Sequence, residues 1–204
     1  MFPILRTVLV VTAALIAAPV NPAHAATSYC VGTPGQLQDA LDDAEVDGDD
    51  SIVKLRSGTY SLGSEVVYET AMQSIIPAGA LTIRGGYNSD CSSYSLTPGA
   101  TTLNGSGAHA LYLYSAGGSI KVLGVTLQSA GMNITSGVYP PCFAPQGEFR
   151  IQRVRVDQGD VAVTALCNHV VVANSLFTNA TNVSGSAAHP GASSLGVYLL
   201  TSDE

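Results

Sequence analysis

The sequence predicts an all-β solenoid whose N-terminal end is closed by one short amphipathic helix. Three observations lead to this prediction. After Asp50 the chain consists of short β-branched and aliphatic runs separated by Gly, Asn, Ser and Pro. Three of those segments can be laid over one another as strand–corner–strand units. Only residues 34–46 show the apolar spacing of a helix.

The helical segment carries signals at both of its ends. Thr33 can cap it, Pro34 occupies the first helical position, and Gln36 completes a T-x-x-Q capping box. Gly48 is expected to end the helix. One apolar stripe is formed by Leu37, Ala40, Leu41 and Ala44, and the opposite face is acidic, with Asp39, Asp42 and Asp43. We therefore expect the stripe to pack on a sheet.

The rest of the chain is predicted to form short strands. The predicted strand-forming runs are Ser51–Leu55, Thr59–Leu62, Ala80–Arg84, Ala110–Tyr114, Ser119–Leu127, Glu148–Asp157, Val161–Ala165 and His169–Phe177. No further helical pattern is present in the sequence. This composition alone is compatible with a sandwich, a barrel or a solenoid, so any internal repeat decides between them.

The repeat is a strand, a corner and a second strand. Its copies are residues 119–127, 148–156 and 169–177. The side chains predicted to point inward are Ile120, Val122, Val125 and Leu127, then Phe149, Ile151, Val154 and Val156, then Val170, Val172, Ser175 and Phe177. The corners fall at Gly124, Arg153 and Asn174, and Gly and Asn tolerate left-handed backbone angles. A coil of a parallel β-helix requires this pattern, whereas a β-sandwich, the alternative, would show hairpin signals.

Several motifs also resemble a known group of proteins. The stretches Leu37–Leu41, Asp49–Leu55 and Ser57–Tyr60, followed by Leu81–Tyr87 and Thr101–Gly105, resemble the opening coils of right-handed parallel β-helix proteins of the pectate-lyase-like superfold, as in bacterial exported proteins. The resemblance covers most of the chain after residue 25. It implies a right-handed parallel β-helix with a capping helix over the first coil, but it indicates little about activity.

The N-terminus has the three zones of a secretory signal peptide. A short start with Arg6 precedes the apolar run Val8–Val20, and Ala23–Ala25 offers a small-x-small cleavage pattern. The alternative is a membrane anchor, for which the run is short. We predict a signal peptide at 1–25, a cap region at 26–50 and a parallel β-helix at 51–204. We expect the C-terminal end of that β-helix to be closed by a partner or continued in a longer parent chain.

All four cysteines follow the predicted signal peptide. An even number in an exported protein predicts two disulfides, with three possible connectivities. We favour Cys30–Cys91 and Cys142–Cys167, because each pair would join neighbouring layers. A metal site is the alternative, but it would need closer C-x-x-C spacing. The protein is therefore expected to be secreted, periplasmic or on the cell surface.

Charge and motifs restrict the possible chemistry. The net charge of −7 argues against nucleic-acid and anionic-membrane partners, and no cofactor motif is present. The catalytic candidates are Arg153, Asp157 and Asp160, with Arg155 and His169 nearby in the sequence. The doubled aspartate and G-H-G element of polygalacturonases are missing, as is a G-x-S-x-G elbow. Charges that alternate along a strand are more often simply solvated.

The function expected from these observations is extracellular binding. We predict a non-enzymatic, adhesin-like module whose ligand is a carbohydrate or another cell-surface molecule, with no membrane span after signal cleavage. The rival hypothesis is a polysaccharide lyase or glycoside hydrolase of the same superfold. The tyrosines Tyr87, Tyr112, Tyr114 and Tyr139 are candidates for stacking on sugars, although tyrosines at strand ends more often pack into the core.

Overall fold

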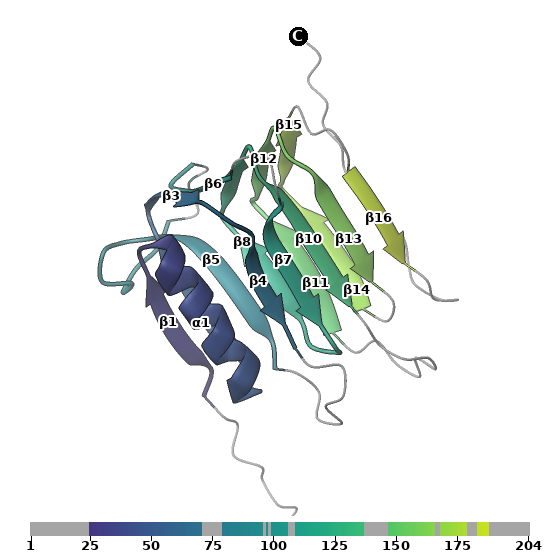
Figure 1. The fold of residues 1–204 in the computed structure, drawn as a ribbon, viewed down its shortest axis with the longest axis horizontal. Helices are drawn as coiled ribbons and strands as arrows, with labels where there is room; N and C mark the ends of the chain where they lie inside the picture. Colours follow the sequence, from purple (N-terminus) through teal and green to yellow (C-terminus); the bar gives the residue numbers. More distant parts are fainter. Residues whose placement is uncertain are drawn as a thin grey trace, which may run out of the picture.

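The computed structural model describes residues 25–70, 79–95, 97, 99–105, 109–136, 147–165, 168–178 and 183–187. These residues form one helix, α1 (Pro34–Asp47), and the strands β1 to β16 (Figure 1). The strands are β1 (Thr27–Val31), β2 (Ser51–Arg56), β3 (Gly58–Leu62), β4 (Val66–Glu69), β5 (Leu81–Tyr87), β6 (Thr101–Gly105), β7 (His109–Ser115), β8 (Ile120–Leu123), β9 (Thr126–Gln128), β10 (Gly131–Ser136), β11 (Gly147–Gln152), β12 (Arg155–Asp157), β13 (Val161–Ala165), β14 (Asn168–Ala173), β15 (Leu176–Thr178) and β16 (Val183–Ala187).

The strands form three sheets, and every strand pair within them is parallel. Sheet A has the order β1-β2-β5-β8-β11-β14, sheet B the order β3-β6-β9-β12-β15, and sheet C the order β4-β7-β10-β13-β16. From β2 onward each strand pairs with the strand three places later in the chain. The chain therefore passes from sheet A to B to C and back to A, and we call one such passage a coil. The arrangement is consistent with a β-solenoid, as the repeat predicted.

The core lies between the three sheets and is filled by alternating apolar side chains. All eight inward positions predicted in the copies 119–127 and 148–156 are buried, with exposed fractions of at most 1%. In the third copy Phe177 is buried, Val170 and Val172 are partly buried against the core, and Ser175 is intermediate. Parallel strands buried on one face need this density of Val, Ile and Leu.

The predicted corners are confirmed by their backbone angles. Gly124, Arg153 and Asn174 have φ values of 65°, 54° and 51°, which lie in the left-handed region. The corners also stack on one another, since Gly124 N donates to Gln152 O and Arg153 N donates to Ala173 O, both at 3.0 Å. A left-handed residue turns the chain from sheet A to sheet B while the alternation of inward side chains resumes beyond it.

Helix α1 begins and ends where the sequence predicts, within one residue. Thr33 Oγ1 accepts a hydrogen bond from Gln36 N at 3.2 Å, and Gly48 is left-handed with φ of 67°. The capping box differs in one detail, because Gln36 Oε1 accepts from Gly32 N at 2.9 Å, one residue before the cap residue. The predicted stripe Leu37, Ala40, Leu41 and Ala44 is buried.

The helix also satisfies backbone groups at the first coil. The side-chain amide of Gln38 donates to Val67 O at 2.8 Å and accepts from Val67 N at 2.9 Å, and Glu45 Oε1 accepts from Glu69 N. Val67 and Glu69 belong to β4, which is the terminal strand of sheet C, so α1 occupies the place of a further strand. Figure 1 shows α1 lying across this end of the stack of strands. The unpaired edge of a parallel sheet is thereby covered.

The cap region contains one strand that the sequence did not predict. Residues 26–50 contain strand β1, which pairs with β2 and extends sheet A.

The Cys30–Cys91 disulfide is confirmed, with 5.8 Å between its Cα atoms. Cys142 and Cys167 lie outside the described residues, as does the predicted signal peptide up to residue 24. Among the residues described, no helix is long and apolar enough to cross a membrane.

Candidate functional site

The outer face of sheet A carries most of the positive charge of the chain. Alternation along β2, β5, β8 and β11 directs five of the eight Lys and Arg residues to this face, while their sequence neighbours point into the core. We call them the cationic face, and they are Lys54, Arg56, Arg84, Lys121 and Arg150. All five are half-buried, and they span four adjacent strands.

The strand register makes these cations lateral neighbours. Lys54 on β2 pairs with Arg84 on β5, and Lys121 on β8 pairs with Arg150 on β11. Adjacent strands lie about 4.8 Å apart. Like charges at directly paired positions destabilise a sheet, so each of these pairs carries an electrostatic cost. Sites of repeated like charge are typical of surfaces that bind a ligand of the opposite sign.

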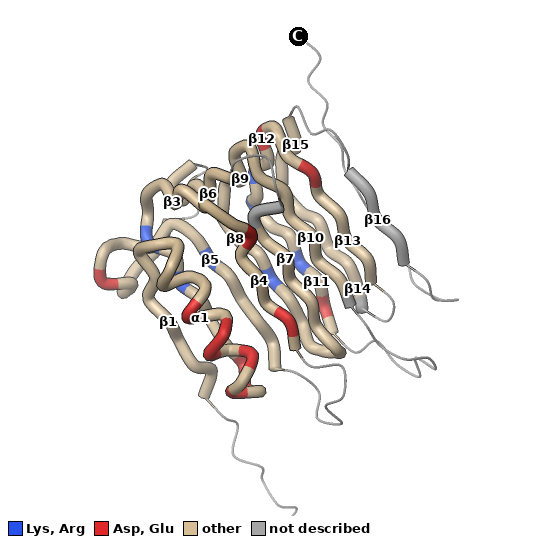
Figure 2. The backbone as a smooth tube through the Cα atoms, in the orientation of Figure 1, with Lys and Arg blue, Asp and Glu red and all other residues tan. Residues whose placement is uncertain are grey.

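The negative charge of the chain lies mainly elsewhere. The protein has fifteen Asp and Glu residues against eight Lys and Arg. Figure 2 shows acidic residues gathered along α1, at the end of the molecule, whereas the basic residues lie on the strands. The cationic face is therefore a local positive surface on an acidic protein.

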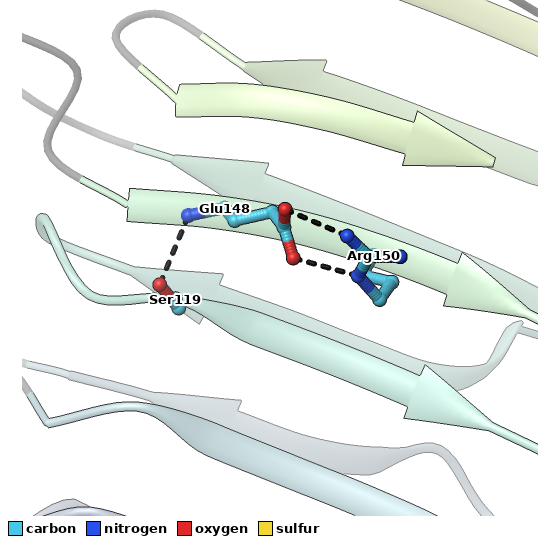
Figure 3. A network of polar contacts seen from close by, with 3 residues as sticks. All are labelled: Ser119, Glu148 and Arg150. Atoms are coloured by element: carbon cyan, nitrogen blue, oxygen red, sulfur yellow. Dashed lines mark hydrogen bonds and ion pairs between the residues drawn. The ribbon is translucent and has the colours of Figure 1, made fainter.

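One carboxylate is built into the cationic face (Figure 3). Arg150 Nε donates to Glu148 Oε1 at 2.7 Å and Arg150 Nη2 donates to Glu148 Oε2 at 2.9 Å, while Glu148 N donates to Ser119 Oγ at 2.9 Å. The hydrogen bonds from Arg150 lower the pKa of the Glu148 carboxyl and raise the pKa of the guanidinium. Both side chains stay about one-third exposed, at 29% and 32%. The pair fixes the direction of the guanidinium on an open surface.

A loop, residues 88–95, folds back over one end of this face. The disulfide joins Cys91 in the loop to Cys30 on β1. Tyr94 of the loop packs on Tyr87 at the end of β5, with 5.1 Å between ring centroids. The guanidinium carbon of Arg84 lies 4.8 Å from the Tyr94 ring centroid, and Lys54 Nζ lies 5.8 Å from that of Tyr87. Two cations of the face therefore pack against aromatic rings.

The tyrosines predicted to stack on sugars have different surroundings. Tyr87 and Tyr114 are buried, Tyr112 is intermediate, and Tyr139 lies outside the described residues. Tyr94, which the sequence did not single out, is 50% exposed. Its position three residues after a cysteine was the available signal, because a disulfide fixes the residues around it to the body of the fold.

The catalytic candidates lie along one coil, around strand β12. Arg153 occupies the corner before β12, Asp157 ends β12, and Asp160 lies in the following corner. The three-residue strand β12 lies between the corner at Arg153 and the corner at Asp160. Asp157 Oδ1 accepts from Thr178 Oγ1 at 3.5 Å, and the backbone oxygen of Asp160 accepts from Met132 N at 2.7 Å. Their catalytic role stays a prediction.

The other two charged candidates face different surfaces. Arg155 is exposed on the outer face of sheet B, one corner away from the cationic face. His169 is exposed on sheet A, where it pairs in register with Glu148. Within the described ranges, no group of three or more His, Cys, Asp or Glu residues gathers as metal ligands would.

Comparison with protein-family models, with curated proteins and with solved structures finds no match to this chain.

Proposed function

We propose that this chain is an exported binding module that holds an anionic polysaccharide on its cationic face without cleaving it. The observation that carries the proposal is the set of five Lys and Arg residues on one outer sheet face of a protein with a net charge of −7. Guanidinium groups bind carboxylates and sulfates through paired hydrogen bonds, and ammonium groups add point charges.

The shape and length of the face support a polymeric ligand. The cations are spread over β2, β5, β8 and β11, so a small molecule could not reach all of them. The register places them in two rows offset by two residues, Lys54 with Arg84 and Lys121 with Arg150, so a polymer with acidic groups along its length can contact both rows.

The proposed fold and location agree with this function. We infer a right-handed parallel β-helix of the pectate-lyase-like superfold, because crossover connections between parallel strands are almost always right-handed and the opening coils resemble that group. The N-terminal signal pattern and the Cys30–Cys91 disulfide support export to an oxidising compartment. The solenoid would then display the cationic face to extracellular glycans.

The test is a glycan array probed with the purified protein, combined with assays for reducing ends and unsaturated sugars. We expect binding to polyuronates or sulfated glycans, weakening as salt is added, no binding to neutral chains, and no products. Turnover that Asp160→Asn abolishes would contradict the proposal and establish the lyase or hydrolase. Binding to neutral glycans with the same affinity would show that the cationic face is not the site.

A further inference from the structure

The three sheets are open at the end of the molecule opposite to helix α1. In the described part of the chain, sheets A, B and C end at β14, β15 and β16, and each of these strands pairs on one side only. Figure 1 shows them at the far end of the stack from α1. An uncovered edge pairs readily with another extended segment, so a soluble solenoid needs an element that closes it.

The core is also less well covered at this end. Val170 and Val172 on β14 occupy the inward positions that Phe149 and Ile151 occupy on β11, one coil earlier. Phe149 and Ile151 are at most 1% exposed, whereas both valines are only partly buried. The described residues therefore present an apolar surface beside β14 that one more strand of sheet A would bury.

The order of the coils indicates which part of the chain reaches this surface. After each of the strands β4, β7, β10 and β13 of sheet C, the chain returns to sheet A. The connection is as short as two residues after β13, at 166–167, and as long as eleven after β4, at 70–80. Strand β16 of sheet C ends at Ala187, so the next strand of sheet A is expected to begin between positions 190 and 199.

One apolar run begins in this window and has the alternation of a strand. It is the sequence LGVYLL at 195–200, which lies outside the described residues and is separated from β16 by seven positions, 188–194. The run has the same length as β14, six residues. Thr201 follows it at the place where the left-handed corner residue Asn174 follows β14. The run therefore aligns with β14 from end to end.

We propose that residues 195–200 bind to the open edge of β14 as a parallel seventh strand of sheet A and so close the core. Val197 then packs beside Val170, and Leu199 packs beside Val172. This alignment has a spacing of 27 residues, and successive strands of sheet A in the described structure are aligned at spacings of 21 to 39 residues. A shift by one residue would turn Val197 and Leu199 to the outer face. The partner of this edge is thus a segment of the same chain, not a second copy.

Hydrogen exchange of the full chain, followed by mass spectrometry, tests the pairing. We expect slow exchange of the amides at 195–200 in a protein that light scattering shows to be monomeric. Exchange there as fast as in an unstructured peptide would overturn the proposal. Slow exchange that appears only at concentrations where the protein dimerises would also overturn it, because a second copy would then cover β14.

Two adjacent leucines provide matched variants of the segment. Leu199→Asp puts a charge at an inward position and should speed exchange at 195–200 by at least about tenfold, because the burial of a whole leucine side chain is lost. Leu200→Asp puts the same charge at an outward position and should leave the exchange close to that of the wild type. Equal effects of the two variants would overturn the proposed alignment.

Two adjacent valines provide the matched variants of β14. Val172→Ala should speed exchange at 195–200 several-fold, because Val172 lies under the segment. Val171 pairs in register with Arg150 and lies on the outer face, so Val171→Ala should not. If neither variant speeds the exchange, the segment binds elsewhere and the proposal is wrong. Exchange of the wild type decides the question even where a variant fails to fold, and no readout depends on glycan binding.

Discussion

Left-handed residues fix the corners of the coils. Besides Gly124, the positions Ser129, Arg153, Gln158 and Asn174 all have positive φ, and only one of these four is an asparagine. A side chain in this conformation is strained by roughly 1–2 kcal/mol relative to the right-handed one. The corner at Arg153 thus stores strain that its two stacked neighbours, Gly124 and Asn174, largely avoid.

Two arginines that lie two residues apart should respond oppositely to replacement by glycine. Arg153→Gly removes the left-handed strain and should stabilise the protein by up to about 1 kcal/mol. Arg155→Gly, in the extended strand β12, should destabilise it by about 0.5–1 kcal/mol. Both variants lose the same charge. Urea unfolding measures the difference, and equal destabilisation by the two variants would contradict the proposed origin of the corner strain.

The Glu148–Arg150 pair should give a pH-dependent contribution to stability. The pKa of Glu148 is lower in the folded state, so its contribution is present above the unfolded value of about 4.3 and is lost as the pH falls through the folded value. At neutral pH, Glu148→Gln should therefore cost about 0.2–1 kcal/mol, as a surface ion pair does. Unfolding curves of variant and wild type should converge in strong acid. A difference that is the same at neutral and acidic pH would refute the role of this ion pair.

Helix α1 acts as a cap because one face meets the core and another meets a strand edge. Leu37 and Leu41 are fully buried beneath it, while Gln38 bonds to the backbone of β4. Tyr68 on β4 is only 2% exposed beside the helix, and this burial raises the pKa of its hydroxyl to about 12. The helix thus replaces a coil both in packing and in hydrogen bonding.

Truncating the buried face of the cap should cost far more than truncating its exposed face. Leu41→Ala removes a fully buried side chain and should lower the free energy of unfolding by about 2–5 kcal/mol. Val46→Ala is the matched control on the same helix, because Val46 is 86% exposed, and it should change stability by less than about 0.5 kcal/mol. Similar losses in urea unfolding for both variants would mean that α1 does not pack as a cap.

The elements with a regular apolar pattern could be predicted from the sequence, and the others could not. The helix and the strands within the repeated copies were predictable, since apolar alternation and a turn-forming residue mark them. Strands β1, β4, β10 and β16 were not predicted, because each is short or interrupted by polar residues and glycine, as in Gly131–Ser136. Their pairing comes from neighbouring coils rather than from their own sequence. The Cys30–Cys91 pairing was predicted correctly from the layers that it would join.

The fold brings together charged residues that lie far apart in the sequence. Lys54 and Arg84 are thirty positions apart and Lys121 and Arg150 are twenty-nine apart, yet each pair is adjacent across two strands. That proximity depends on coil length and register, which loops of different length between copies conceal in the sequence. The outward direction of Arg150 could be predicted from alternation along its strand, but the common face could not. The same holds for Tyr94, whose place depends on the disulfide.

The most direct test of the cationic face compares two variants of equal charge. Lys121→Gln removes a cation from the outer face of sheet A, and Arg155→Gln removes one from the outer face of sheet B, so the net charge of both variants is the same. We expect the affinity for polygalacturonate at low salt to fall several-fold in Lys121→Gln and to remain close to wild type in Arg155→Gln. Equal losses in the two variants would show that binding follows overall charge alone, and would contradict a specific binding face on sheet A.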